Sequence, residues 1–228
     1  MSTPEPTLLA DETDPQPVVG QEVVYRGLVW DVRRDAVDLG EAGVVQRDLI
    51  DHPGAVAVIA MDEDERIALV QQYRHPIGLR EWEVPAGLLD IGGEPPHVCA
   101  ARELAEEADL VAGEWSMLID YATSPGYTSE AIRIYLARDL SPVPEGERHA
   151  RDGEELGMPL RFVSLDEAYD AVVAGRLHNP HTVIGIFAAY AARSRGWATL
   201  NPADVPWPLW ERLRGGRHFW SRTGTPVP

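Results

Sequence analysis

The chain has 228 residues, of which 44% are hydrophobic, and this suits one globular domain with a buried core. There are 37 acidic residues against 20 basic ones, and the formal net charge of −17 argues against a broad nucleic-acid-binding face. No apolar run is long enough to cross a lipid bilayer, so no membrane partner is expected.

The N-terminal segment 1–17 is rich in Pro, Asp, Glu and Thr and lacks the basic-then-apolar pattern of a secretory signal. We interpret it as a solvated tail. The sequence has one cysteine, Cys99, which cannot form a disulfide within the chain and fits a reducing compartment. We therefore expect a cytoplasmic protein.

Strand-forming sequence dominates the chain after this tail, across residues 22–61. The apolar residues within 23–30 and the alternating stretch 44–50 predict strands on either side of a glycine-containing turn. The run 55–60 is wholly apolar and rich in Val and Ala, which is typical of a strand covered on both faces.

In the central part of the chain, the pattern predicts a turn at 62–65 and then a strand at 67–73. This strand is followed by another at 82–85. A loop at 86–93 then leads into a helix at 94–108. Pro95 and Pro96 fall in the first turn of this helix, where a missing N–H costs little. Glu94 precedes them, where the helix dipole favours negative charge.

The remaining sequence predicts strands at 115–121, 131–137 and 160–163, an acidic loop at 141–157, and helices at 165–174 and 181–193. From Gly196 onward the chain is rich in Pro and Trp, with Trp207, Trp210 and Trp220 close together. We expect this end to pack on the body or on a partner subunit.

The helix predicted at 94–108 carries three glutamates on one face, since Glu103, Glu106 and Glu107 stand at i, i+3 and i+4. The opposite side is expected to form the core-facing stripe, made of Val98, Ala101, Leu104, Ala105 and Ala108. Like charges at this spacing cost roughly a few tenths of a kcal/mol per pair, which a bound cation would relieve. Carboxylate oxygens suit Mg²⁺ or Mn²⁺ better than zinc, whereas the three glutamates alone also fit a solvent-exposed acidic helix.

The residues around this helix favour the cation site, because their order resembles the Nudix box of the Nudix hydrolases. After Glu94 and an interval of seven residues come Arg102 and Glu103, and then the pair Glu106 and Glu107. The long ordered spacing makes this match far more specific than the acidic face alone.

Two departures from the family pattern occur, and neither falls on an expected metal ligand. The interval between Gly87 and Glu94 is one residue longer than in the family pattern, and Asp109 replaces a closing glycine. Aspartate is among the non-glycine residues that best tolerate a left-handed helix end, so the helix can still stop there.

Segments outside the box resemble the ADP-ribose pyrophosphatase branch of this family, at 72–74, 83–87, 124–130 and 175–179. The resemblance spans residues 23–192 and leaves out the tail and the Trp-rich end. It implies that ADP-ribose is the substrate.

The resemblance also implies roles for the residues of the box. Glu103 and Glu107 would be the main Mg²⁺ ligands, assisted by Glu106 and the backbone carbonyl of Ala86, with Mn²⁺ as a substitute. Arg102 would orient the glutamates through charge-assisted hydrogen bonds.

Substrate contacts are expected from residues outside the box. Arg47 and Arg74 match positions that hold the nucleotide and its phosphates in the resembling enzymes, although each could equally form a surface ion pair. Glu83 and Glu130 are candidates for contacts with ribose or with metal-bound water. Glu94 is expected to support the box from the start of the helix.

The general base of the resembling enzymes comes from a mobile loop outside the box. Here the acidic loop offers Asp152, Glu154 and Glu155, of which we favour Glu155 with Glu154 in reserve. A solvated run of charge is the alternative reading for each of them.

The remaining polar residues near the motif are interpreted as structural. Cys99 precedes Glu103 by one helical turn, and a soft thiol is a poor magnesium ligand, so we expect it to pack beside the site. His178 and His181 border a predicted helix and show no metal-binding spacing.

The fold implied is the α/β (α+β) Nudix fold, a mixed β-sheet in an α/β/α sandwich with an N-terminal antiparallel strand region. The predicted organisation begins with a disordered acidic tail at 1–20 and an N-terminal β region for dimerisation at 21–53. The Nudix hydrolase domain follows at 54–195, and a Trp/Pro-rich extension at 196–228 ends the chain. In this branch the N-terminal region supports a homodimer with shared active sites.

The implied reaction is Mg²⁺-dependent hydrolysis of ADP-ribose to AMP and ribose 5-phosphate. Two alternatives stay open at this stage. The same chemistry could act on another nucleoside diphosphate sugar, or the chain could be a non-catalytic Nudix domain that senses ADP-ribose. A sensor of this kind usually carries a DNA-binding module, and the acidic sequence shows none.

Overall fold

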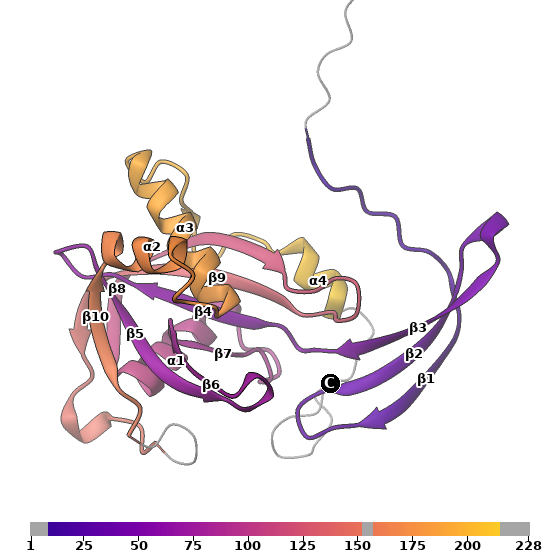
Figure 1. The fold of residues 1–228 in the computed structure, drawn as a ribbon, viewed down its shortest axis with the longest axis horizontal. Coiled ribbons are helices and arrows are strands. Elements are labelled where there is room, and N and C mark those ends of the chain that lie inside the picture. The colour runs from indigo at the N-terminus through magenta and orange to yellow at the C-terminus, as the bar shows by residue number, and fades with distance from the viewer. Residues whose placement is uncertain (1–8, 152–156, 215–228) are drawn as a thin grey trace, which may run out of the picture.

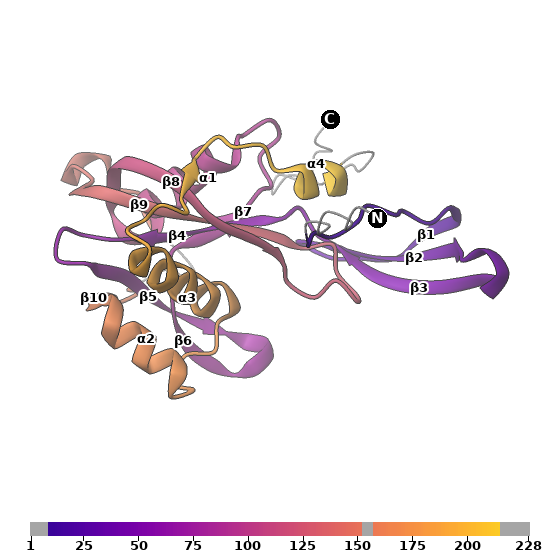
Figure 2. The ribbon, with the colours of Figure 1, turned by 90° about the horizontal axis from the view of Figure 1, so that it is seen from above.

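The computed structural model describes residues 9–151 and 157–214. The chain opens with a three-stranded antiparallel sheet in the order β1-β2-β3, formed by Val18–Arg26, Asp31–Asp38 and Val44–Asp51. This N-terminal sheet extends away from the rest of the molecule, which we call the body (Figure 1 and Figure 2). The predicted strand at 23–30 is wrong at its end, because Arg26 pairs with Asp31 and residues 27–30 must make the reversal.

The body is built on a five-stranded sheet in the order β11-β8-β9-β4-β7, formed by Asn201–Pro202, Leu110–Ala122, Ala131–Pro142, Ala55–Ala60 and Ala86–Leu88. The β4–β9 pair is parallel and the other pairs are antiparallel, which confirms the predicted mixed sheet. Every residue of β4 is buried, as its continuous apolar run predicted.

A second sheet of the body has the order β10-β5-β6, with bounds Leu160–Ser164, Arg66–Arg74 and Leu79–Glu83. Two sequence expectations fail here. The strand predicted at 82–85 begins earlier, because the hairpin with β5 already pairs Arg74 with Leu79. The loop predicted at 86–93 contains β7, whose pairing with β4 no local pattern could reveal.

The helices are α1 at Pro96–Ala108, α2 at Leu165–Val173, α3 at Pro180–Ser194 and α4 at Pro208–Arg214, with short 3-10 turns at Gly40–Ala42, His75–Ile77 and Glu145–Glu147. Side-chain caps start two of them. The Ser164 hydroxyl accepts from the Glu167 N–H, and the Asn179 side chain accepts from the Thr182 N–H, so backbone donors at both helix starts are satisfied.

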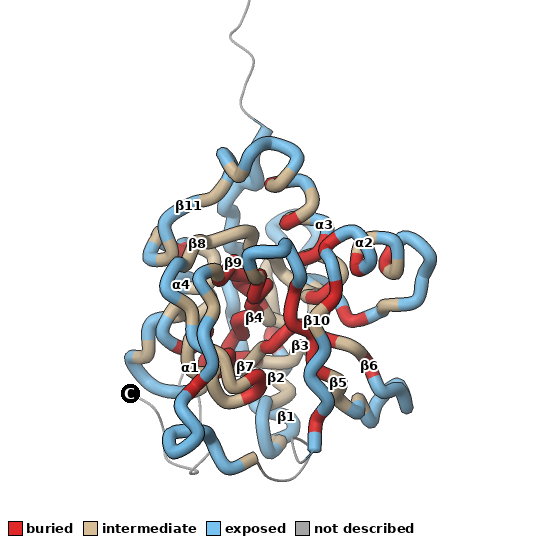
Figure 3. The backbone as a smooth tube through the Cα atoms, turned by 90° about the vertical axis from the view of Figure 1, so that its left-hand side faces the viewer, coloured by how far each residue is buried: buried red, intermediate tan, exposed pale blue. Residues whose placement is uncertain are grey.

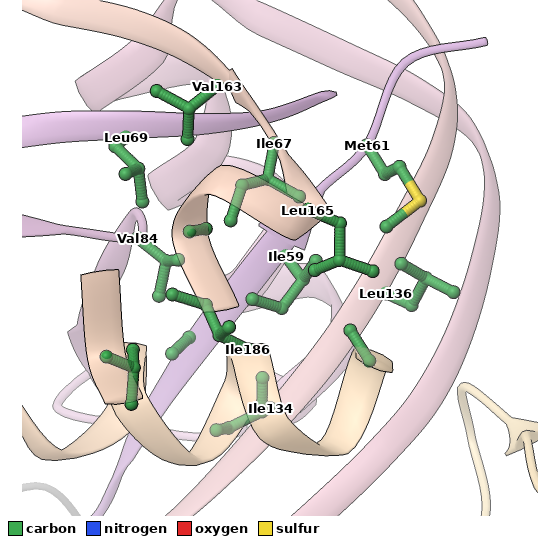
Figure 4. Packing of buried hydrophobic residues seen from close by; sticks show 14 of the residues in the cluster. Ile59, Met61, Ile67, Leu69, Val84, Ile134, Leu136, Val163, Leu165 and Ile186 are labelled. Atoms are coloured by element: carbon green, nitrogen blue, oxygen red, sulfur yellow. The ribbon is translucent and has the colours of Figure 1, made fainter. Parts of the chain in front are cut away.

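Helices cover both faces of the five-stranded sheet. Ile59 and Ile134 point from β4 and β9 toward Leu165 and Ile186 of α2 and α3 (Figure 4). The alternate residues of β4 pack on the other side with α1, in a cluster that includes Leu104. Buried residues follow the strands at the centre of the body (Figure 3). The predicted α/β/α sandwich is therefore confirmed.

The Trp-rich end packs on the body in its described part, which ends at residue 214. β11 pairs with β8, and Trp207 is buried in the cluster beneath α1. The Trp207 and Trp210 rings stack at a centroid distance of 5.7 Å, whereas Trp220 lies outside the described residues. None of the helices within residues 9–151 and 157–214 combines the length and apolarity needed to span a bilayer.

Candidate active site

The helix α1 is delimited by the residues that the sequence placed at its ends. Pro96 occupies the first turn, after Pro95 in an extended conformation. Asp109 ends the helix in the left-handed conformation at φ 54°, and its N–H donates to the Leu104 carbonyl. The aspartate that departs from the family pattern thus terminates the helix as a glycine would.

The orientation of α1 differs from the predicted one. Cys99, Leu104 and Ala108 are buried together with Glu103 and Glu107, while Val98 is 44% exposed. The glutamates therefore border the packed stripe instead of lying opposite it. Both carboxylates are more than 90% buried, with exposed fractions of 6% and 8%, so they are held against the sheet.

Strand β7 accommodates the two buried carboxylates. A Cβ atom added to Gly87 would lie 2.0 Å from the Glu103 Cδ, so only glycine leaves room for this side chain. One residue earlier, the Ala86 N–H donates to the Glu107 Oε2 at 2.9 Å. Glu103 and Glu107 are thus fixed along one short strand, one by close approach and the other by a hydrogen bond.

Arg102 links the carboxylates of the motif. Its Nε and Nη2 donate to both oxygens of Glu94, each at 3.0 Å, and its Nη1 lies 2.6 Å from Glu103 Oε1 and 3.3 Å from Glu106 Oε2. The hydrogen bond to Glu94 contributes most to a raised pKa of Arg102, so the guanidinium stays charged. Cys99 packs beside it, and burial raises the pKa of the thiol, which keeps it protonated.

A second ion pair lies on the β5–β6 hairpin. Arg74 donates from Nε and Nη2 to the two oxygens of Glu83, at 2.7 and 2.5 Å. Burial alone would lower the pKa of Arg74, but the carboxylates of Glu83, Glu107 and Glu81 raise it. The charge of Glu107 thus acts on Arg74, which places this ion pair near the carboxylates of α1.

Two residues of this site were missed or set aside at the sequence level. His181 was interpreted as structural, yet its Nε2 lies 3.7 Å from Glu83 Oε2. Glu81 was not considered; it is 8% exposed and its Oε1 has no hydrogen-bond partner among the described residues. The alternation of β6, which places Glu81 on the face of Glu83, was the signal available for it.

Comparison with known proteins identifies the family to which the residues of this site belong. Residues 51–182 match the NUDIX domain family. The chain belongs to the Nudix family. The matched region runs from the last residue of β3 to the start of α3 and contains the box helix with its supporting strands. Nudix proteins generally use divalent metal ions.

Named relatives cover most of the chain. It is 41% identical over 189 residues to an ADP-ribose pyrophosphatase of Mycobacterium tuberculosis, a match that covers 83% of this chain and 89% of the relative. A methanol dehydrogenase activator of Bacillus methanolicus is 38% identical over 72% of this chain and 87% of its own length. An ADP-ribose pyrophosphatase of Bacillus subtilis is 34% identical over 68% and 87% respectively.

A solved structure supports the fold alone. The crystal structure of an ADP compounds hydrolase superposes with a TM-score of 0.68 at 21% identity and covers 82% of this chain and 99% of its own. The Nudix sandwich with its N-terminal sheet is therefore shared with that protein.

The structure gathers most of the predicted site residues around the Nudix box, namely Ala86, Arg102, Glu103, Glu106, Glu107, Arg74 and Glu83. Arg47 is not brought to them. It is exposed on β3 of the N-terminal sheet, where its Nη1 donates to the Gln46 carbonyl, and this sheet extends away from α1 in both views (Figure 1 and Figure 2).

Glu130 lies at the junction between the N-terminal sheet and the Nudix body. Its Oε2 accepts from the Thr123 hydroxyl at 2.8 Å, and its Oε1 lies 3.3 Å from Nε2 of His52. The loop that carries it pairs with β3, through the Ile50 N–H to the Tyr127 carbonyl at 2.8 Å. Glu130 is thus placed from both sides of the junction.

The predicted general bases Asp152, Glu154 and Glu155 lie outside the described residues. Arg151, the residue before them, contacts the end of the box helix. Its Nε donates to the Glu106 carbonyl at 3.0 Å and its Nη2 to Asp109 Oδ2 at 2.7 Å. The acidic loop is therefore tied to α1 immediately before position 152.

The Nudix box offers oxygen ligands for a divalent ion, but these ligands are not already arranged as a complete coordination site. Within residues 9–151 and 157–214, no three His, Cys, Asp or Glu side chains are grouped so that they could hold a metal together. The donors are nevertheless of the kind that hard cations prefer, because Glu103 and Glu107 are buried carboxylates one helical turn apart. Gly87 leaves space for the Glu103 side chain beside β7, which is consistent with a role of this carboxylate as a metal ligand.

Proposed function

We propose that this protein hydrolyses the diphosphate bond of ADP-ribose to AMP and ribose 5-phosphate, with Mg²⁺ as its cofactor. The observation that carries the proposal is the identity of 41% to a named ADP-ribose pyrophosphatase across 83% of the chain. The buried glutamates of the box and the nearby Arg74 support it, since the reaction needs anionic ligands for a cation and a cation for the diphosphate.

The metal ligands in this proposal are Glu103 and Glu107, assisted by Glu106 and the backbone carbonyl of Ala86. Their hard oxygen atoms favour Mg²⁺, with Mn²⁺ as a substitute. When bound, a divalent cation neutralises the diphosphate and lowers the pKa of water, which prepares the water to attack phosphorus. Because Arg102 already contacts Glu103 and Glu106, it would orient these carboxylates through charge-assisted hydrogen bonds.

Arg74 and Glu83 are proposed to contact the substrate as a pair. The bidentate ion pair fixes the guanidinium plane while the Arg74 side chain stays 38% exposed, so its outer edge can meet a phosphate. Burial by itself would raise the pKa of Glu83, but the facing His181 and Arg74 lower it below its ordinary value. Glu83 therefore stays ionised near neutral pH and holds Arg74 in place.

The general base is proposed to be Glu155, with Glu154 in reserve. Arg151 is bound at the end of α1, and an extended chain advances by at most about 3.6 Å per residue. Four steps along the chain therefore keep the Cα of residue 155 within about 14 Å of the Cα of Arg151, whose side chain is bound to the box helix. A Glu155→Gln variant should lose turnover with little change in substrate affinity, and an effect confined to Glu154→Gln would assign the base to Glu154.

A second chain is proposed to complete the molecule as a homodimer. All nine residues of β1 are exposed, among them Val23, Val24 and Tyr25, so the N-terminal sheet has no layer of its own to cover it. Exposed apolar surface of this kind marks protein interfaces. The same sheet carries Arg47 and extends away from α1 of its own chain (Figure 1 and Figure 2), so Arg47 would serve a partner's site.

Two parts of the sequence reading stay predictions. The division at 20/21, 53/54 and 195/196 into tail, dimerisation region, catalytic domain and extension is one of them, although β1 begins at Val18, inside the expected tail. The cytoplasmic location is the other.

The substrate is tested by product analysis across a panel of nucleoside diphosphate derivatives with Mg²⁺. We expect ADP-ribose to be hydrolysed fastest and to yield AMP and ribose 5-phosphate. If a nucleotide sugar is hydrolysed much faster than ADP-ribose, the alternative substrate class is favoured. The panel includes such sugars because the Bacillus methanolicus relative is named a methanol dehydrogenase activator and not an ADP-ribose pyrophosphatase. Binding of ADP-ribose without any hydrolysis would favour the sensing alternative.

A further inference from the structure

One buried carboxylate on β6 has no part in the reaction proposed above. Glu81 is 8% exposed, and its Oε1 has no hydrogen-bond partner among residues 9–151 and 157–214. The buried Glu83 of the same strand, by contrast, accepts two hydrogen bonds from Arg74. A buried polar atom without a partner costs stability, so the packing of the hairpin does not explain why a glutamate stands at position 81.

The register of the β5–β6 hairpin places Glu81 between Arg74 and its partner. β6 pairs Leu79 with Arg74 and Glu83 with Val70, and Glu81 stands midway between these two positions. Residues two apart along a strand lie on one face, so Arg74, Glu81 and Glu83 share a face of the hairpin. Because Arg74 donates to Glu83 at 2.7 and 2.5 Å, its side chain extends along this face past the position of Glu81.

Three carboxylates act on the guanidinium of Arg74. Burial lowers the pKa of Arg74, but the hydrogen bond and the charge of Glu83 raise it. The charges of Glu107 and Glu81 raise it further, so the pKa lies above its ordinary value. One positive charge is therefore outweighed by negative ones as long as no cation is bound. Because Glu81 is buried, water and salt screen its charge only weakly.

This face of the hairpin leads to the Nudix box along the chain. Glu83 ends β6, and Ala86, whose N–H donates to Glu107, begins β7 three residues later. Three residues span at most about 11 Å, so the Arg74–Glu83 pair stands beside the cation ligands of the box. A diphosphate held between those ligands and Arg74 would therefore be repelled by the charge of Glu81.

We propose that Glu81 is a residue whose negative charge makes binding of the diphosphate depend on the divalent cation. Its carboxylate repels the diphosphate while the metal ligands are unoccupied, and it attracts the cation that removes this repulsion. A nucleotide is then held only where the cation needed for its hydrolysis is present. This role rests on the proposed function, because it takes the ligand to carry a diphosphate and the cation to bind at the box.

The charge of Glu81 is removed with little change of shape by Glu81→Gln. Glu81→Asp keeps the charge and is the matched control. The affinity for ADP-ribose is measured by calorimetry in EDTA, with no divalent cation present. We expect Glu81→Gln to bind ADP-ribose about tenfold more tightly than the wild type under these conditions, because the repulsion is lost. Glu81→Asp should bind it as the wild type does.

The affinity for Mn²⁺ in the absence of nucleotide separates charge from packing. Glu81→Gln should bind Mn²⁺ about threefold more weakly than the wild type, because a negative charge near the cation is lost. The two affinities therefore change in opposite directions, whereas a disturbed site would weaken both. Glu114→Gln, which neutralises an exposed glutamate on β8, should change neither affinity.

Equal affinities of the wild type and Glu81→Gln for ADP-ribose in EDTA would overturn the proposal, and so would a gain that Glu81→Asp shares. If Glu81→Gln does not fold, Glu81→Met, an uncharged side chain of similar length, takes its place with the same expectations. If neither variant folds, the carboxylate serves the fold and the proposal is wrong. Failure of the proposed function would appear differently, as wild-type protein that binds Mg²⁺ but does not hydrolyse ADP-ribose.

Discussion

Glu107 allows the metal role to be tested without disturbing the fold. Its Oε2 accepts from the Ala86 N–H, and the amide oxygen of Gln can accept the same bond. Glu107→Gln should therefore keep the thermal midpoint while turnover falls by about 100-fold or more, since loss of even the outer partners of metal ligands costs about 10- to 100-fold. Glu114→Gln, the same change at an exposed strand position, is the control. Near-normal turnover in Glu107→Gln would refute the metal role.

Gly87 provides a second test at a residue that carries no functional group. A methyl group there would meet the Glu103 carboxyl at 2.0 Å, and that flexible side chain can move aside at little cost in stability. We expect Gly87→Ala to keep its fold while its affinity for Mn²⁺, measured by calorimetry, falls by about tenfold, because the carboxylate leaves its place. Unchanged metal affinity would mean that the position of Glu103 beside β7 is irrelevant to binding.

The sequence predicted the identity of these residues but not their surroundings. The spacing of Glu103, Glu106 and Glu107 follows from helix periodicity, which is local. Their burial could not be predicted, because the room for Glu103 comes from a glycine on a strand that itself went unrecognised. The contact between His52 and Glu130 could not be predicted for the same reason, since the two residues are distant in sequence and a lone histidine carries no spacing signal.

At the scale of elements, a strand whose own sequence carries a clear apolar pattern was predicted more accurately than one that is defined by its pairing with another strand. β4 was predicted at its observed bounds because burial on both faces leaves an uninterrupted apolar run. β7 has three residues and exists through its pairing with β4, so nothing within it signals a strand. The described part of the Trp-rich end belongs to the same class, because it contacts remote parts of the chain, with β11 paired to β8 and Trp210 bonded to Pro53.

Those remote contacts give α4 a stabilising role that can be measured. The Trp210 indole N–H donates to the Pro53 carbonyl at 3.0 Å, and a Cβ on Gly54 would lie 2.9 Å from the Trp210 ring. Gly54 also has φ +90°, which side chains disfavour. We expect Gly54→Ala to lower the free energy of unfolding by about 2–4 kcal/mol, combining backbone strain with overpacking.

The control for this experiment is Gly40→Ala, because Gly40 has φ +64° with nothing near its Cβ position. It should show the cost of strain alone, on the order of 1 kcal/mol. Urea denaturation of both variants measures the difference. If the two variants are equally destabilised, then the packing of Trp210 of α4 against Pro53 and Gly54 does not add to the stability of the protein.

At the scale of the whole molecule, the N-terminal sheet is the part that cannot be explained within one chain. Within the described part of its three strands, Asp35 is the one fully buried residue, and Arg33 holds that carboxylate at 2.9 Å. A sheet normally buries at least one apolar face. Here the apolar side chains of β1 face outward, so its stability should depend on a covering surface, and the proposed second copy supplies one.

Light scattering tests this dependence directly. At micromolar concentration we expect a mass of twice 25.2 kDa, the mass of one chain. Val23→Asp should shift the mass toward a monomer, because it places a charge in the apolar interface that β1 is proposed to form. Val111→Asp is the matched control, as Val111 lies on β8 with an exposed fraction of 41% against 43% for Val23, and its mass should not change. A wild-type mass of one chain would leave Arg47 without a site to serve and would end the proposal of a shared active site.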